Sequence, residues 1–179
     1  IAGGTGSGKT TLANGCLGLA VGDVSGHGFD TALVMVQTRA ALRSIAGSYT
    51  DPGAILAQMN ANLVTDVAEA QYVTLVLAVL NSETRTMHYA SAGHTTGYLL
   101  SANGDVKREV TSTGVPLGLF PGQRYESVIL PNLQRGDVLA LTTDGINESS
   151  NHDGVEFGSD GALEVIRRHI RDSAAEIVD

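Results

Sequence analysis

Two consecutive β-hairpin signals in residues 72–111 constrain the fold of this chain more than any other feature. Residues 72–80 and 85–92 are rich in β-branched and aromatic side chains, and a polar turn over residues 81–84 joins them. A second pair of short strands flanks Asn103-Gly104, a dipeptide suited to the positive backbone angles of a tight type I′ turn. Because hairpins pair their strands antiparallel, the sequence predicts antiparallel sheet at the centre of the fold.

Two helices are predicted before these hairpins. Apolar residues recur at helical spacing over residues 29–46, and we expect a largely buried helix there. Asp51 and Pro52 are typical of a helix cap and a first helical residue, and a second apolar stripe follows them. The expected stripes are Phe29, Leu33, Val36 and Ala40 in the first helix, and Ile55, Leu56, Met59, Leu63 and Val67 in the second.

The remaining elements complete an α+β pattern. The apolar run at residues 16–22 ends at Asp23, as a buried strand would, and further strands are expected at 124–130 and 137–143. Leu163, Ile166 and Ile170 indicate a closing helix. Helices followed by a strand meander and another helix predict an α+β domain with mainly antiparallel sheets, and disfavour a doubly wound parallel fold.

Composition narrows the classes of partner. The 179 residues carry a net charge of −8 and a sequence pI of about 5.0, which disfavours nucleic acid and anionic membranes because no basic surface would displace their counterions. Cys16 is the single cysteine, so an internal disulfide is excluded, in keeping with a reducing cytoplasm. No run approaches the roughly 18 apolar residues of a membrane span. We expect a cytoplasmic globular domain of undetermined oligomeric state.

Two aspartates follow predicted strands directly. Asp23 follows the run CLGLAVG, and Asp144 follows the run DVLALTT. Each precedes glycine-permissive backbone, so the carboxylate leaves the core while the strand fixes its position. Hard divalent cations such as Mg²⁺ and Mn²⁺ prefer such oxygen ligands, although an aspartate at a strand end also commonly caps a turn.

A series of sequence motifs places these aspartates in a family context. The runs are GDVSGHGFDTALVMVQTRAALRS, VTLVLAVLNSETRTMHYASAGHTTGYLL, GVPLG, LQRGDVLALTTDGINES and GVEFG. In their order along residues 16–170, these motifs resemble those of the SpoIIE-type branch of the PPM metal-dependent serine/threonine phosphatases. Together they are far more specific than any one alone.

The resemblance implies a fold, a reaction and site residues. The fold would be the layered α/β/β/α sandwich of PPM phosphatases. Asp23 would bridge two Mn²⁺ or Mg²⁺ ions beside the backbone carbonyl of Val24, and Asp144 would bind the second metal; both aspartates would thus serve catalysis. The ions would hold a hydroxide that attacks phosphoserine or phosphothreonine in line, without a covalent enzyme intermediate. As in relatives, the substrate would be a phosphorylated anti-anti-sigma factor or a similar regulator.

The chain departs from the family pattern near both of its ends. The pattern has a GGD segment before the first strand, where this chain reads IAGGTGSGKTTLANG, and a later Asp-Asp segment that is not reached by Asp179. Ser173 and Glu176 also form a helix-capping signal close to that end. We therefore expect a partial phosphatase domain over residues 16–179, truncated at both ends. Losing two acidic ligands weakens metal binding, so a catalytically impaired interaction module is the alternative function.

The N-terminal run also matches a phosphate-binding P-loop from Gly3 to Thr10. In a working P-loop Gly8, Lys9 and Thr10 would contact phosphates and Mg²⁺, and the chain would be a nucleotide-binding protein. That motif needs a strand before it and a helix after it, whereas glycines interrupt the residues that follow here. We treat residues 1–15 as a stub, not as an independent domain.

Three further polar residues lie near the motifs. His94, in the sequence AGH, lies between Gly93 and Thr95, which indicate a turn at a strand end. We therefore expect a structural role for it, not a role as an acid or metal ligand. His27 neighbours the metal turn, where approach to substrate and a plain loop role are equally open. Glu148 is expected to hold the loop that follows Asp144.

Overall fold

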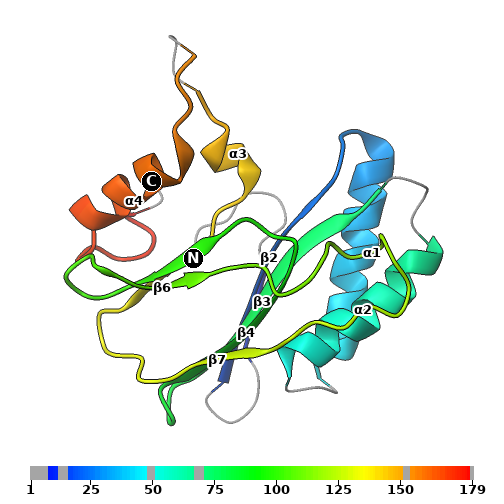
Figure 1. The fold of residues 1–179 in the computed structure, drawn as a ribbon, viewed down its shortest axis with the longest axis horizontal. Helices are drawn as coiled ribbons and strands as arrows, with labels where there is room; N and C mark the ends of the chain where they lie inside the picture. Colours follow the sequence, from blue (N-terminus) through cyan, green and yellow to red (C-terminus); the bar gives the residue numbers. More distant parts are fainter. Residues whose placement is uncertain (1–7, 12–15, 48–50, 67–70, 151–153, 178–179) are drawn as a thin grey trace. The chain divides into compact units, whose positions relative to one another are not determined.

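The computed structural model describes residues 8–11, 16–47, 51–66, 71–150 and 154–177. Figure 1 shows its helices and strands along the chain. The described residues divide into two compact units. One contains Thr5–His94 and Ser112–Leu133, and the other contains Thr95–Thr111 and Gln134–Asp179.

The first unit contains a five-stranded sheet in the order β1-β2-β3-β4-β7, in which every neighbouring pair is antiparallel. The predicted hairpin between β3 and β4 is confirmed, with Asn81 opposite Thr86. The Asn81 side chain shapes the turn, because its Oδ1 accepts hydrogen bonds from the amides of Glu83 and Thr84, both at 2.9 Å. The strands are β1 (Gly8–Thr11), β2 (Cys16–Val24), β3 (Val73–Asn81), β4 (Thr86–Ala92) and β7 (Val128–Leu130).

Two helices, α1 (Phe29–Ile45) and α2 (Pro52–Asp66), pack on each other and on this sheet (Figure 1). The predicted cap of α2 is confirmed, since Asp51 Oδ2 accepts a hydrogen bond from the Ala54 amide at 2.8 Å. The α2 stripe also faces the core, where Leu56 and Met59 are fully buried. Val67 lies outside the described residues.

The predicted buried face of α1 is wrong. Phe29, Leu33 and Val36 are 83%, 49% and 64% exposed, and Ala40 is exposed as well. The residues that α1 buries are instead Val34, Thr38 and Ile45. Apolar side chains occur on most sides of this helix, so periodicity alone did not distinguish the face that packs on the sheet.

This correction gives a matched pair of substitutions on α1. We expect Val34→Ala to lower the free energy of unfolding by about 2 kcal/mol, because a buried side chain loses two methyl groups and leaves a cavity. Val36→Ala should change it by less than about 0.5 kcal/mol, because that side chain is in solvent. Urea unfolding of the two variants measures both values. Equal losses would contradict the assigned face.

The second unit contains a three-stranded antiparallel sheet in the order β6-β5-β8. Its strands are β5 (Gly97–Leu100), β6 (Val106–Val110) and β8 (Val138–Ala140), and its helices are α3 (Asp144–Asn147) and α4 (Gly158–Arg168). Helix α4 is the predicted closing helix, and it buries Leu163. The α+β class with antiparallel sheets is therefore confirmed in both units.

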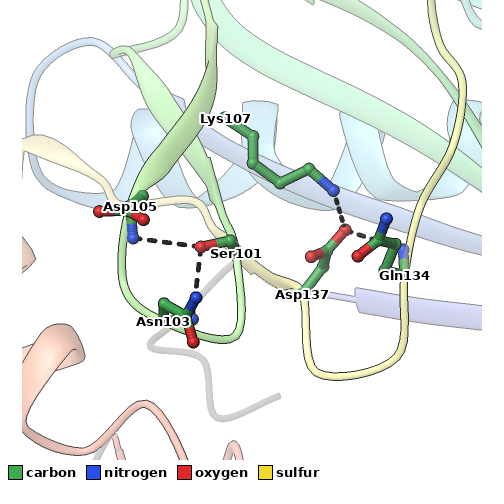
Figure 2. A network of polar contacts seen from close by, with 6 residues as sticks. All are labelled: Ser101, Asn103, Asp105, Lys107, Gln134 and Asp137. Atoms are coloured by element: carbon green, nitrogen blue, oxygen red, sulfur yellow. Dashed lines mark hydrogen bonds and ion pairs between the residues drawn. The ribbon is translucent and has the colours of Figure 1, made fainter.

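The second hairpin exists, but its turn is not of type I′. Only Gly104 has a positive φ, +87°, whereas type I′ requires positive values at both central residues. The connection is longer than two residues, and Ser101 organises it: its Oγ accepts from the Asn103 and Asp105 amides, both at 3.3 Å (Figure 2). Beside it, Lys107 forms an ion pair with Asp137, which links β6 to the residue preceding β8.

Candidate metal centre

Asp23 lies at the end of strand β2 with an exposed side chain, between the buried residues Gly22 and Val24. Side chains alternate between the two faces of a strand, so the apolar neighbours anchor β2 while the carboxylate faces solvent. In the β2–β3 register Asp23 lies directly opposite Thr74. The carboxylate is accessible to a ligand, while its backbone is fixed by the sheet.

The turn after Asp23 is held against the start of β3. The Ser25 amide donates to the Tyr72 carbonyl, and Ser25 Oγ accepts from the Tyr72 amide, both at 2.9 Å. Gly26 and Gly28 adopt φ values of +91° and +100°, which side-chain-bearing residues rarely adopt. These contacts turn the chain sharply from β2 into α1. They also fix the backbone on both sides of the Val24 carbonyl.

Asp144 begins helix α3 in the second unit and is exposed. Its own carbonyl accepts a hydrogen bond from the Glu148 amide at 2.8 Å, which closes the short helix. Just before it, Thr95 Oγ1 donates to the Thr142 carbonyl at 2.6 Å and fixes the segment leading from β8. Asp144 is thus a second accessible carboxylate, but β8 ends at Ala140 and not at residue 143 as predicted, so Asp144 begins a short helix instead of following the strand directly. The role of the Glu148 side chain stays a prediction.

The oxygen donors present suit a hard divalent cation. Asp23 and Asp144 offer carboxylates, and Val24 offers a backbone carbonyl, which are the ligand types that Mg²⁺ and Mn²⁺ prefer. Within the described ranges, however, no three His, Cys, Asp or Glu side chains gather where they could hold a metal. In each of the two units the donor chemistry fits a divalent cation.

His94 and His27 differ in their surroundings. His94, just after β4, is only 4% exposed, and its Nδ1 lies 3.1 Å from Thr74 Oγ1. This placement is compatible with the predicted structural role. His27 is exposed within the turn after Asp23, and its role stays open.

The residues of the P-loop match that the structure describes lie in a strand. Gly8, Lys9 and Thr10 lie in strand β1, which pairs antiparallel with β2. A P-loop places its lysine where a loop enters a helix, so that backbone amides converge on the phosphates. In a β-ladder the amides point to the neighbouring strand or away from it, so these residues lack that cradle. The earlier part of the motif, at residues 3–7, lies outside the described residues.

Asn60 supports the loop before β7, and sequence reasoning missed it. This α2 residue is 1% exposed, its Nδ2 donates to the Phe120 carbonyl, and its Oδ1 accepts from the Gly118 amide, both at 2.9 Å. The available signal was a polar residue within the buried stripe of α2, directly after Met59. Such a residue is buried only when its hydrogen bonds are satisfied.

Tyr125, in the same loop, is 6% exposed, and its hydroxyl has no hydrogen-bond partner in the described part of the chain. Burial raises the pKa of this phenol from 10.0 to about 12. Because the folded state holds the phenol proton more tightly than the unfolded state does, the free energy of unfolding declines as the pH rises from 10 to 12.

We therefore expect Tyr125→Phe to raise the free energy of unfolding by about 1 kcal/mol at neutral pH, because it removes an unsatisfied buried hydroxyl. Between pH 10 and 12 the free energy of unfolding should also fall less steeply in the variant, because the variant has no phenol at position 125. Denaturant unfolding at several pH values measures both effects. Parallel pH profiles for the two proteins would contradict the assignment.

Comparison with known proteins places this geometry in a family. A family model described as "Stage II sporulation protein E (SpoIIE)" matches residues 13–179. The chain is 27% identical over 162 residues to "Phosphoserine phosphatase RsbU" of Bacillus subtilis (strain 168), covering 90% of this chain and 48% of that protein. The chain belongs to the SpoIIE family, and it is a SpoIIE-type domain of the PPM phosphatase class.

Solved structures agree with this assignment. The "SiaA-PP2C domain of Pseudomonas aeruginosa" matches with a TM-score of 0.79 and 26% identity, covering 96% of this chain and 68% of that one. The RsbU and RsbW domains of Rv1364c from Mycobacterium tuberculosis match with a TM-score of 0.72 and 28% identity, covering 92% and 47%. The predicted PPM-type fold class is confirmed.

The matches cover only part of the related proteins. The chain spans about half the length of RsbU. None of the described helices is long and apolar enough to cross a membrane. PPM phosphatases as a class depend on divalent metal, but membership of the family does not decide between Mn²⁺ and Mg²⁺.

Proposed function

We propose that this chain hydrolyses phosphoserine and phosphothreonine monoesters in a protein substrate, with divalent metal as the cofactor. The observation that carries the proposal is the exposed Asp23 carboxylate, held between a buried strand and a tightly bonded turn. Membership of the SpoIIE family and similarity to a phosphoserine phosphatase support the same reaction.

In this proposal Asp23, the Val24 carbonyl and Asp144 are metal ligands. Bound Mn²⁺ or Mg²⁺ would supply a water with a lowered pKa and would stabilise charge on the transferring phosphoryl group. The chain's own contribution is to hold these oxygens in place. The β2–β3 ladder and the bonds between Ser25 and Tyr72 keep the Asp23 backbone fixed, and α3 fixes Asp144.

The substrate we propose is a phosphorylated regulatory protein of the anti-anti-sigma-factor type. Similarity to RsbU supports this class, and the net charge of −8 argues against nucleic acid as the partner. We assign the activity to residues 16–179 and leave β1 as an added edge strand. A cytoplasmic location is part of the same proposal, supported by the single cysteine.

A second candidate function is a phosphatase-like module that binds a phosphoprotein without hydrolysing it. The favouring observation is that the described residues bring no three potential side-chain ligands together. Because each carboxylate offsets part of the cation's charge, an incomplete set weakens metal binding.

Phosphate release from three peptides, carrying phosphoserine, phosphothreonine or phosphotyrosine, separates the candidates. The proposal predicts Mn²⁺-dependent release from the first two, abolished by excess EDTA. A folded chain that releases no phosphate from any peptide at millimolar Mn²⁺ would exclude the enzyme. Binding of a phosphoserine peptide in that case would identify the interaction module.

A further inference from the structure

A buried histidine is connected to the backbone of Asp23 through one hydroxyl group. His94 Nδ1 lies 3.1 Å from Thr74 Oγ1, and that hydroxyl lies 3.5 Å from the Asp23 carbonyl oxygen. Thr74 and Asp23 are direct partners in the β2–β3 register. The chain of contacts therefore runs from the end of β4, across β3, to the end of β2.

The histidine is held in place from its own side. The Gly93 amide lies 2.8 Å from both the Gly114 carbonyl and Ser112 Oγ. Leu117, further along the same loop, exchanges two backbone hydrogen bonds with Val73, at 3.0 and 2.8 Å. The loop thus ties the end of β4 to the start of β3. It fixes the distance between the His94 backbone and Thr74.

The proton count couples the directions of these two hydrogen bonds. A threonine hydroxyl has one proton to donate, and the Asp23 carbonyl can only accept. When Thr74 donates to Asp23, its oxygen must accept from His94, so the ring must carry a proton on Nδ1. A neutral imidazole then has the Nδ1–H tautomer. Without the His94 ring, the Thr74 hydroxyl can rotate, and nothing then points its proton toward the Asp23 carbonyl oxygen.

We propose that His94 is a positioning residue that acts through Thr74 on the peptide between Asp23 and Val24. This peptide joins the two residues whose side-chain and carbonyl oxygens are proposed above as metal ligands, so its orientation affects where both oxygens point. The inference rests on the proposed metal-binding function of Asp23. Groups that orient metal ligands from behind commonly contribute 10–100-fold to metal affinity.

Calorimetric titration with Mn²⁺ tests the effect on binding. We expect Thr74→Val and His94→Leu each to weaken Mn²⁺ binding by about tenfold. Thr74→Ser, which keeps the hydroxyl, should bind like the unmodified chain, and His94→Asn, which offers an amide N–H near the Nδ1 position, should recover part of the loss. If Thr74 and His94 only filled space, Thr74→Ser and His94→Asn would bind Mn²⁺ no better than Thr74→Val and His94→Leu.

Two matched controls come from the same strand pair. Thr86→Val and His88→Leu make the same chemical changes in β4, and Thr86 lies opposite Asn81 at the far end of the β3–β4 ladder. Both controls should bind Mn²⁺ as tightly as the unmodified chain. Losses equal to those of Thr74→Val and His94→Leu would show a general loss of sheet integrity and would overturn the positioning role.

Nitrogen-15 NMR of the histidine rings tests the hydrogen-bond direction without any metal. The proposal predicts an Nδ1–H tautomer for His94 in the unmodified chain and a shifted ring signal in Thr74→Val. An Nε2–H tautomer would overturn it. Unchanged Mn²⁺ affinity in both Thr74→Val and His94→Leu would overturn it while leaving the proposed function intact. Failure of the unmodified chain to bind Mn²⁺ would overturn both.

Discussion

Replacing Asp23 and Asp144 together by Asn is expected to lower Mn²⁺-dependent hydrolysis of p-nitrophenyl phosphate by at least about 10³-fold. Metal ions contribute several kcal/mol to stabilising the charge that develops in phosphoryl transfer, and each 1.36 kcal/mol corresponds to a tenfold change in rate. Asn keeps the shape of Asp but removes the negative charge that would hold the cation. Initial rates over a range of Mn²⁺ concentrations measure the loss.

The same double substitution should leave the fold unchanged, because both side chains are exposed. Asp105→Asn is the matched control, since Asp105 is an exposed aspartate in the β5–β6 loop. It should retain the full rate. Retention of activity by the double variant would mean that other residues bind the metal.

Gly53→Ala is expected to lower the free energy of unfolding by about 3 kcal/mol. A methyl group at this position would lie 2.2 Å from the carbonyl oxygen of Tyr125 and 2.8 Å from Ser127 Oγ. The first contact is with backbone, which cannot rotate away, so helix α2 must shift. It would also disturb the hydrogen bond from the Gly53 amide to Ser127 Oγ. Overpacking of this kind typically costs 1–3 kcal/mol.

Gly47→Ala provides the control for this prediction. Nothing lies within 4 Å of the position that its methyl group would occupy. The control should therefore change the free energy of unfolding by no more than about 0.5 kcal/mol. Urea unfolding of both variants gives the comparison, and equal midpoints for Gly53→Ala and the unmodified chain would refute the close approach of α2 to Tyr125.

Local signals predicted much of the fold. The polar turn led by Asn81 makes its expected hydrogen bonds, and Asp51 caps α2 as predicted. Ser173 and Glu176 also form their reciprocal capping contacts, at 2.8 and 3.4 Å, although the further helix is only a turn in the described residues. Each of these features depends on residues within five positions of one another, which sequence reading handles well.

Features that depend on tertiary contacts were not predictable. The face that α1 buries is decided by the sheet and α2, and the apolar pattern of the helix offered Phe29 as readily as Val34. The turn at Asn103-Gly104 is lengthened by the Ser101 contacts, which propensity did not reveal. The contacts of Asn60 join residues 58 and 60 positions apart.

In the candidate site, too, local features were predictable and tertiary contacts were not. Asp23 and Asp144 were located by their places at strand ends, and the structure puts both carboxylates in solvent. The link from His94 through Thr74 to Asp23 spans three strands, so only the strand register reveals it. The meaning of the P-loop match likewise depends on its surroundings, and the structure places Gly8, Lys9 and Thr10 in strand β1.

Calorimetric titration of the unmodified chain with Mn²⁺, beside the Asp23→Asn, Asp144→Asn double variant, tests the central claim most directly. The account predicts saturable Mn²⁺ binding by the unmodified chain and its loss in a double variant that remains folded by circular dichroism. Absence of binding by the folded, unmodified chain, or equal binding by both proteins, would contradict the claim that these aspartates hold the metal.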